Sequence, residues 1–218
     1  MSTAKALVLD FGGVISRTMF ETHHLSEAAL GLEPGSLTWR GPFEPASDPL
    51  WLSMQRGEIS ERDYWMARTV ETGRRIGREW TRMEDFVAAA RGDDPAAIIR
   101  PEARNAIMAA AAAGRRLAIL SNELDLFYGA GLRARLPLLD RFDLIVDATH
   151  TGILKPDPRA YAFVTGGLGL EAGDCVFVDD QARNVAGARQ AGMLAVHFDV
   201  TDPEASYRRA LALLGTTA

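Results

Sequence analysis

Cysteine is almost absent from this chain. Cys175 is the single one among 218 residues, and it lies within an apolar run. One cysteine cannot form a disulfide within the chain. Because its neighbours are apolar, we expect Cys175 to be a small buried hydrophobic residue rather than a reactive thiol.

Long hydrophobic runs and basic clusters are missing as well. Residues 1–5 lead into only four apolar residues before Asp10, too few for a signal-peptide core or a membrane span. The formal net charge is -5 and no basic run is present, which gives little support to a nucleic-acid-binding surface. We therefore expect a cytoplasmic protein that binds neither nucleic acid nor membrane.

What is present is the composition of an ordinary globular protein, with 47% hydrophobic and 24% charged residues. The length allows a substantial core, and it suits one domain or a domain with a sizeable insertion.

The chain is organised around residues 7–14. A short run of branched apolar residues ends in Asp10, and Gly12 and Gly13 follow closely. This pattern predicts a buried parallel strand that delivers Asp10 at its carboxyl end, where open α/β sheets keep their chemistry. The two glycines allow main-chain groups to approach a ligand closely beside the carboxylate.

Helix signals replace strand signals over residues 16–99. Ser60 with Asp63, and Thr81 with Glu84, are capping-box patterns that begin two of these helices. The region is therefore expected to be an all-helical insertion.

From Pro101 onward, predicted helices and strands alternate. The expected strands are 117–120, 144–146, 175–178 and 194–196, and the expected helices are 101–114, 126–139, 182–191 and those that begin after Pro158 and Asp202. Such alternation predicts an α/β fold with a doubly wound parallel sheet covered by helices on both faces. The expected core comprises residues 1–15 and 100–218, with the helical insertion at 16–99.

The ends of four predicted strands carry polar residues that should converge on one crevice. They are Asp10, Ser121 with Asn122, Lys155 in the loop after the third of these strands, and the pair Asp179 and Asp180. Three carboxylates at close range could not all stay ionised without a cation, because like charges raise each other's pKa. Oxygen ligands of this type suit Mg²⁺, which also binds substrate phosphate.

Lys155 lies in a loop that the sequence constrains. Proline follows Asp157, which indicates that Asp157 caps the next helix and that Lys155 is not on a mobile surface. A fixed ammonium beside carboxylates can neutralise a phosphoryl group and orient a nucleophile. Ser121 and Asn122 offer a hydroxyl and an amide that can bind phosphate oxygens.

The order of these motifs resembles the haloacid dehalogenase-like (HAD) hydrolase superfamily. The motifs are Asp10-Phe11-Gly12-Gly13-Val14, Ser121-Asn122, Lys155-Pro156-Asp157-Pro158, and Val178-Asp179-Asp180 with Asn184. The resemblance extends over essentially the whole chain, since the insertion is similar to that family's helical cap.

The resemblance implies phosphoryl transfer from a small phosphorylated substrate through a covalent aspartyl-phosphate. It assigns attack on phosphorus to Asp10, phosphoryl binding to Ser121 and Asn122, and charge neutralisation to Lys155. It implies that Mg²⁺ is held by Asp10, the Gly12 carbonyl and Asp180, with Asp179 as a ligand or as a neighbour that supports the ligands, and that Asn184 orients the metal site or its waters.

One position departs from the pattern of the family's phosphatases. They usually carry a second Asp, the general acid and base, where this chain has Gly12. General acid-base catalysis typically contributes about 100- to 10,000-fold in rate. Gly12 therefore predicts a slow enzyme, a good leaving group, or a substitute acid from the cap, for which Glu21, His23 and His24 are candidates.

Three other activities were weighed against a phosphatase. The family's dehalogenase branch also lacks the second Asp and attacks carbon without metal, but it has no use for the pair Asp179 and Asp180. A phosphomutase must pass a proton both ways, which Gly12 cannot do. A phosphate- or protein-binding module without turnover stays open. We expect a Mg²⁺-dependent phosphatase, and exposed cap aromatics such as Trp39 or Trp51 could serve a homodimer interface.

Overall fold

The computed structural model describes residues 3–91 and 94–216, and the contacts between Cα atoms divide the chain into two compact units. The first, the core unit, comprises Met1–Arg17, Ala96–Asp125 and Gly131–Ala218. The second, the cap unit, comprises Thr18–Pro95 and Leu126–Ala130. The division differs from the expected one chiefly in the short segment Leu126–Ala130, which belongs with the cap unit.

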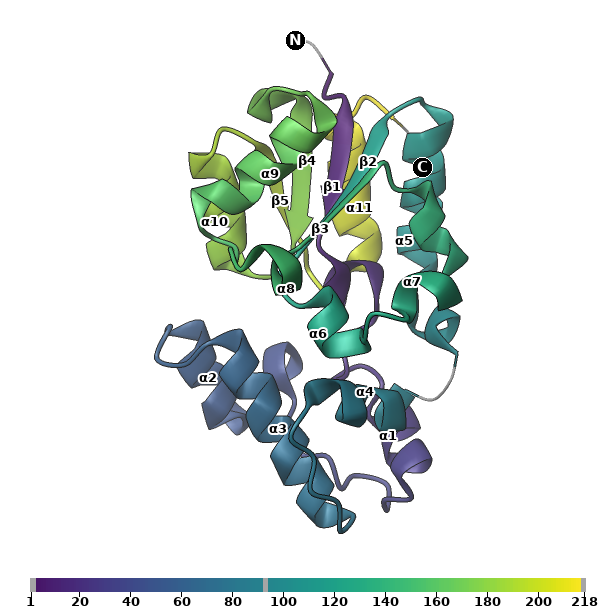
Figure 1. Cartoon of the computed structure of the whole chain (residues 1–218), viewed down its shortest axis with the longest axis vertical. Coiled ribbons are helices and arrows are strands. Elements are labelled where there is room, and N and C mark those ends of the chain that lie inside the picture. The colour runs from purple at the N-terminus through teal and green to yellow at the C-terminus, as the bar shows by residue number, and fades with distance from the viewer. Residues whose placement is uncertain (1–2, 92–93, 217–218) are drawn as a thin grey trace. The chain divides into compact units, whose positions relative to one another are not determined.

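Within the described residues, the core unit contains a sheet of five parallel strands (Figure 1). They are β1 (Ala6–Leu9), β2 (Arg116–Ser121), β3 (Leu144–Asp147), β4 (Cys175–Asp179) and β5 (Leu194–His197), in the spatial order β3-β2-β1-β4-β5. In register, Ala6 of β1 lies opposite Arg116 of β2 and Cys175 of β4. The sheet confirms the predicted doubly wound α/β fold, and Cys175 is buried as expected.

The central strand β1 is buried along its whole length. Helices cover both faces of the sheet at this strand, which is why its sequence is a continuous apolar run rather than an alternating one. Because β2 lies on one side of it and β4 on the other, the order of the strands reverses here. Ligands of such sheets bind outside the carboxyl ends of the strands at this reversal, so Asp10 stands where a ligand is expected.

Helices cover the sheet on both faces, in two pairs (Figure 1). The helices α5 (Pro101–Ala112) and α11 (Pro203–Leu213) pack together on one face, and α9 (Pro158–Leu168) and α10 (Ala182–Gln190) pack together on the other. Asp157 caps α9, as predicted, by accepting the N–H group of Arg159 at 2.9 Å. None of the described helices combines the length and the apolar character that a membrane span requires.

The continuous helix expected over residues 126–139 is wrong. The chain forms α6 (Leu124–Tyr128), α7 (Leu132–Arg135) and a 3₁₀ turn at Pro137–Arg141 in its place. Gly129 adopts a φ of 78°, which interrupts the first helix. Pro137 lacks the N–H group that would continue the second. A further short helix, α8 (Ala148–Thr151), follows β3.

The cap unit contains the helices α1 (His23–Leu30), α2 (Pro49–Gln55), α3 (Glu61–Arg75) and α4 (Met83–Arg91). The predicted capping box at the start of α3 is confirmed, because the hydroxyl of Ser60 accepts the Asp63 N–H group and the Asp63 carboxylate accepts the Ser60 N–H group. The second predicted capping box, Thr81 with Glu84, lies close to the start of its helix, since α4 begins two residues after Thr81.

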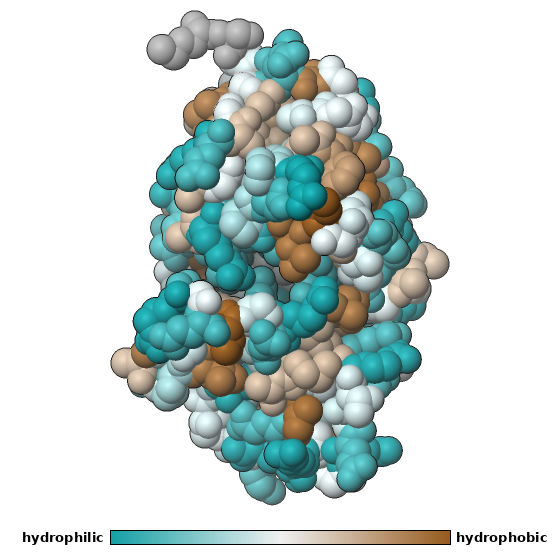
Figure 2. All heavy atoms as spheres, turned by 60° about the vertical axis from the view of Figure 1, so that its left-hand side comes forward, coloured by the Kyte–Doolittle hydropathy of each residue, from teal (hydrophilic) through white to brown (hydrophobic). Residues whose placement is uncertain are grey.

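The expectation that Trp39 and Trp51 are exposed is wrong. They are only 2% and 8% exposed, because both rings pack edge-on against Phe20 in the hydrophobic cluster of the cap unit. A tryptophan at this depth offers no surface for a homodimer. On the face shown in Figure 2, hydrophilic side chains predominate and hydrophobic residues lie in small separate groups.

Candidate active site

The carboxyl ends of neighbouring strands bring the predicted site residues together in the core unit. Asp10 directly follows β1, Ser121 is the last residue of β2, and Asp179 is the last of β4. The Asp10 N–H group donates to the Val178 carbonyl at 2.9 Å, which continues the pairing of β1 with β4. Carboxylate oxygens of Asp10, Asp179 and Asp180 all lie within 4.8 Å of one another. These three residues form the acidic cluster.

Lys155 provides an ammonium group within the acidic cluster. Its Nζ lies 2.9 Å from Oδ1 of Asp10 and 2.7 Å from Oδ2 of Asp179, and the residue is only 3% exposed. Burial alone would lower the pKa of Lys155, but the negative charges of Asp10 and Asp179 outweigh burial and raise that pKa. Lys155 is therefore a cation that holds the Asp10 carboxylate in place.

The side chain of Asn122 fixes the main chain of Lys155. Its Oδ1 accepts the Lys155 N–H group at 2.7 Å, and its Nδ2 donates to the Lys155 carbonyl at 3.3 Å. Both ends of this amide are thus occupied by the loop that carries the lysine. The neighbouring Ser121 is buried, and its hydroxyl accepts the Glu123 N–H group at 3.4 Å. Phosphate binding by Ser121 and Asn122 stays a prediction.

Asp179 is fully buried and its carboxylate is saturated with hydrogen bonds. Its Oδ2 accepts from Lys155, its Oδ1 accepts the Gln181 N–H group at 2.8 Å, and Nδ2 of Asn184 lies 3.1 Å from both oxygens. Because these donors occupy both oxygens, Asp179 is built to hold Lys155 and Asn184. Asp180 is only partly buried.

The residues of this site fit a divalent metal ion. The acidic cluster brings three carboxylates close together, and such oxygens favour a cation in their midst. In addition, Oδ1 of Asn184 is buried and has no hydrogen-bond partner among the described residues. A buried amide oxygen normally has a partner, so this one indicates a ligand or an ordered water beside Asp179.

Comparison with known proteins agrees with this geometry. The haloacid dehalogenase-like hydrolase family matches residues 4–192. The chain belongs to that family. This confirms the resemblance read from the motifs and makes the protein a HAD-like hydrolase.

Two curated relatives are similar over most of this hydrolase. Phosphatase MT3486 of Mycobacterium tuberculosis (strain CDC 1551 / Oshkosh) is 32% identical over 200 residues, which span 89% of this chain and 87% of the relative. Protein CbbY, plasmid, of Cupriavidus necator is 30% identical over 223 residues, which span 96% and 84%.

A solved dehalogenase shares the fold of this HAD-like hydrolase. The L-2-haloacid dehalogenase from Xanthobacter autotrophicus, with chloropropionic acid covalently bound, superposes with a TM-score of 0.57 at 22% identity. The match covers 89% of this chain and 77% of that one. At this identity the likeness supports the fold alone.

Gly12 has room for the side chain that it lacks. A Cβ atom built at Gly12 would meet nothing within 4 Å, and the backbone angles of φ -68° and ψ 127° suit any residue. Glycine is therefore not required here by crowding or by backbone strain, in contrast with Gly13, whose φ is 75°. The missing acid is a chemical departure rather than a structural necessity.

Two of the three candidate substitute acids in the cap unit have surroundings that do not favour proton donation. The Glu21 carboxylate accepts from the N–H group and the hydroxyl of Thr18, at 2.8 and 2.7 Å. Burial and the nearby Arg40 charge lower the pKa of His23 to about 4. His23 is therefore neutral at pH 7 and cannot act as an imidazolium acid. His24 is exposed.

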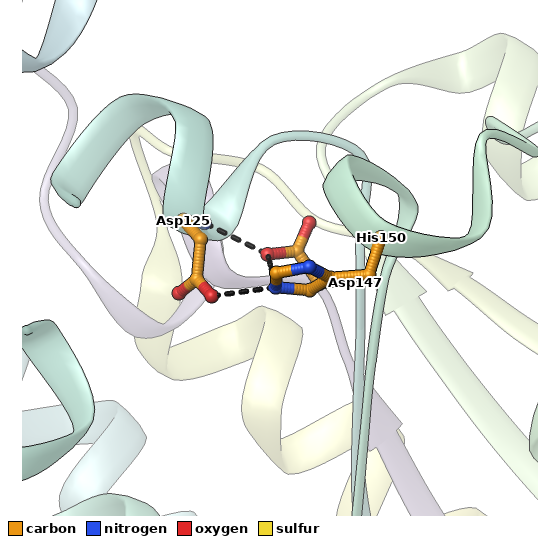
Figure 3. Close-up of side chains that lie close together, drawn as sticks. All are labelled: Asp125, Asp147 and His150. Atoms are coloured by element: carbon orange, nitrogen blue, oxygen red, sulfur yellow. Dashed lines mark hydrogen bonds and ion pairs between the residues drawn. The ribbon is translucent and has the colours of Figure 1, made fainter. Parts of the chain in front are cut away.

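A second cluster, Asp125, Asp147 and His150, was not found from the sequence (Figure 3). Asp147 ends β3, and its carboxylate accepts the N–H groups of Leu124, Asp125 and Thr149 at 3.3, 2.8 and 2.9 Å. His150 Nε2 lies 2.7 Å from Oδ2 of Asp125. Asp147 therefore anchors the start of both α6 and α8.

The signal that could have revealed Asp147 was the same one that revealed Asp10. Both acids stand at the carboxyl end of a short apolar parallel strand. The contact of Asp125 with His150 carries no such signal, since 25 residues separate the two in the chain.

Proposed function

We propose that this HAD-like hydrolase is a Mg²⁺-dependent phosphatase that acts on a small phosphorylated metabolite. The observation that carries the proposal is the position of Lys155 Nζ, which contacts both Asp10 and Asp179 from a buried site. An ammonium fixed in this way orients the nucleophile and can neutralise the charge of a transferring phosphoryl group.

The reaction would proceed in two displacements at phosphorus. The Asp10 carboxylate attacks the phosphoryl group, the phosphorus–oxygen bond to the leaving alcohol breaks, and an aspartyl-phosphate forms on Asp10. Water then attacks the acyl phosphate, which releases phosphate and restores the Asp10 carboxylate. The leaving oxygen takes its proton from water or from a residue outside position 12, because Gly12 has no proton to give.

Asp10, Asp180 and the main-chain carbonyl of Gly12 are proposed to hold the metal. When bound, Mg²⁺ supplies Lewis-acid stabilisation of the negative charge on the phosphoryl oxygens. Asp179 is proposed to support the site, because its oxygens already accept from Lys155, Gln181 and Asn184. The orphaned Oδ1 of Asn184 is available to a metal-bound water.

Dehalogenation of a haloacid is the less favoured chemistry. A haloacid brings its own carboxylate, which the three clustered carboxylates would repel, whereas a phosphoryl group is accommodated when a cation is bound between them. A solved dehalogenase shares the fold, and two relatives that cover most of the chain are named a phosphatase and protein CbbY.

Gly12 favours one second candidate, a phosphate-binding module with little or no turnover. It removes the residue that would protonate the leaving group and activate water. The retained contacts of Lys155 with Asp10 favour an enzyme, and the assay below separates the two.

The test is release of inorganic phosphate from a panel of sugar phosphates, nucleotides and p-nitrophenyl phosphate, with Mg²⁺ and with EDTA. Chloride release from 2-chloropropionate is followed in parallel. The proposal expects phosphate release that EDTA abolishes. Halide release without metal would overturn it in favour of a dehalogenase, and silence in both assays, together with measurable phosphate binding, would favour the binding module.

A further inference from the structure

The two chain segments that connect the core unit with the cap unit pair with each other. Ser16 and Ile99 form an isolated antiparallel bridge, the Arg17 N–H group donates to the Ile98 carbonyl at 2.7 Å, and the Arg100 N–H group donates to the Ile15 carbonyl at 3.0 Å. The segment in which the chain returns from the cap unit contains Ile98, Ile99 and Arg100 and is called the returning segment. It therefore lies directly against the end of the turn Phe11–Ile15, which follows the nucleophile.

Arg100, in the returning segment, reaches into that turn. The residue is 3% exposed, and its Nε donates to the carbonyl oxygen of Gly13 at 3.0 Å. Its guanidinium group also lies over the ring of Phe198, with 5.6 Å between the Cζ atom and the ring centroid. A hydrogen bond from a charged donor is stronger than one between neutral groups.

The peptide group between Gly12 and Gly13 lies between two anchored carbonyls. The Phe11 carbonyl accepts the Ser16 N–H group at 2.9 Å, and the Gly13 carbonyl accepts from Arg100. Two consecutive glycines have no Cβ to restrict rotation, so this peptide would be free to turn without its anchors. Its oxygen is the Gly12 carbonyl.

We infer that Arg100 is a positioning residue, which fixes the orientation of the Gly12 carbonyl and thereby raises the affinity of the site for Mg²⁺. The inference rests on the proposed function, because it takes the Gly12 carbonyl as a metal ligand. Residues that orient metal ligands typically contribute about 10- to 100-fold in metal affinity. Through its hydrogen bond to Gly13, Arg100 also joins the returning segment to the turn beside the nucleophile.

Mg²⁺ binding measured by calorimetry tests this inference without relying on turnover. Arg100→Met keeps an unbranched apolar chain over Phe198 and removes the donor, so we expect the Kd for Mg²⁺ to rise about tenfold. Arg100→Lys retains a charged donor and should recover part of that loss. Near-ultraviolet circular dichroism and thermal melts establish that each variant is folded, and Arg100→Lys carries the test where Arg100→Met does not fold.

Tyr207→Phe is the matched control. The Tyr207 hydroxyl donates to the Val14 carbonyl at 3.0 Å, which is the next carbonyl along the same turn. Its removal loosens the turn without releasing the Gly13 carbonyl, so we expect a smaller change in Mg²⁺ affinity. In phosphate-release assays, Arg100→Met should raise the half-saturating Mg²⁺ concentration far more than the KM for substrate.

Two results would overturn the role of Arg100: an unchanged Kd in Arg100→Met, or an equal rise in Arg100→Met and Tyr207→Phe, which would show general loosening. If the unaltered protein binds Mg²⁺ and releases phosphate in either case, only this inference fails. If the unaltered protein neither binds Mg²⁺ nor releases phosphate, the proposed function fails and the inference fails with it.

Discussion

Two clusters of carboxylates stand at the same edge of one sheet, yet they are built differently. At the end of β3, three main-chain N–H groups converge on Asp147, and the Asp125 carboxylate lies 2.7 Å from Nε2 of the exposed His150 (Figure 3). At the ends of β1 and β4, three carboxylates gather around the buried ammonium group of Lys155.

The difference indicates a structural role for Asp147 and supports the proposed site at Asp10, Asp179 and Asp180. A carboxylate whose acceptors are taken by local main-chain donors fixes the start of a helix and has completed its task. Several acids and a lysine with a shifted pKa, gathered at the reversal point of a sheet, form a poor structural element and a good site for a charged ligand. Proximity alone does not distinguish the clusters, but the identity of the hydrogen-bond donors does.

The largest difference between the clusters is expected in the rate of phosphate release when one acid of each cluster, Asp10 or Asp125, is replaced. Asp10→Asn removes the proposed nucleophile and should lower the rate of phosphate release at least about 1,000-fold. Asp125→Asn keeps an acceptor for His150 and should leave the rate close to that of the unaltered protein. Both rates are measured at saturating Mg²⁺. Equal losses in the two variants would remove the distinction between the clusters.

Loss of the cation should also separate the clusters, this time in stability. Lys155→Met leaves Asp10 and Asp179 without their ammonium partner in a buried site, which should lower the free energy of unfolding by about 3–5 kcal/mol in EDTA. His150→Gln removes a partner whose side chain is 60% exposed, and should cost less than about 1 kcal/mol. Urea unfolding measures both values. A Lys155→Met protein as stable as the original would contradict the account of this buried pair.

Mg²⁺ should stabilise the protein through one cluster only. At a concentration of about 100 times its Kd, a ligand that binds only the folded state adds about 2.7 kcal/mol. We expect this gain to be lost in Asp180→Asn and retained in Asp147→Asn, although Asp147→Asn itself weakens the anchoring of α6 and α8. Thermal melts with Mg²⁺ and with EDTA give the comparison. Retention of the gain in Asp180→Asn would remove Asp180 from the metal site.

The smallest expected effect concerns the position that departs from the family's phosphatases. Gly12→Asp meets no steric obstacle at the Cβ position and restores a general acid and base. The rate of phosphate release should rise by at least about tenfold, which is below the range of about 100- to 10,000-fold that general acid-base catalysis typically contributes. Steady-state kinetics with a substrate whose leaving group is poor shows the change in rate most clearly. No gain would indicate that another group already supplies the proton.

Strand positions and the convergence of Asp10, Lys155 and Asp179 at one edge of the sheet were predictable from the sequence because both depend on local signals. Apolar runs that end in Asp10, Ser121 and Asp179 locate the strands and the edge of the sheet where their side chains meet. The hydrogen bonds to the Asp179 carboxylate were not predictable, because their donors include Lys155 from a loop and Asn184 from a helix.

Other features depended on tertiary packing and could not be derived from periodicity. A helical pattern over 126–139 is interrupted because Gly129 adopts a left-handed conformation. The burial of Trp39 and Trp51 depends on their contacts with Phe20, and no periodicity in the sequence indicates that these three residues meet. The contact of Arg100 with Gly13 joins residues that are 87 positions apart.

Trapping the covalent intermediate tests the central claim most directly. Without a general base at position 12, hydrolysis of the aspartyl-phosphate should be slow, so the phosphorylated enzyme should accumulate during turnover. The protein is mixed with Mg²⁺ and a substrate that it hydrolyses in the phosphate-release assay. The reaction is then quenched in acid, and the protein is digested and examined by mass spectrometry. The account predicts the mass gain of one phosphoryl group on the peptide that contains Asp10, and its absence in Asp10→Asn. Rapid phosphate release with an unmodified Asp10 peptide at every quench time would contradict it.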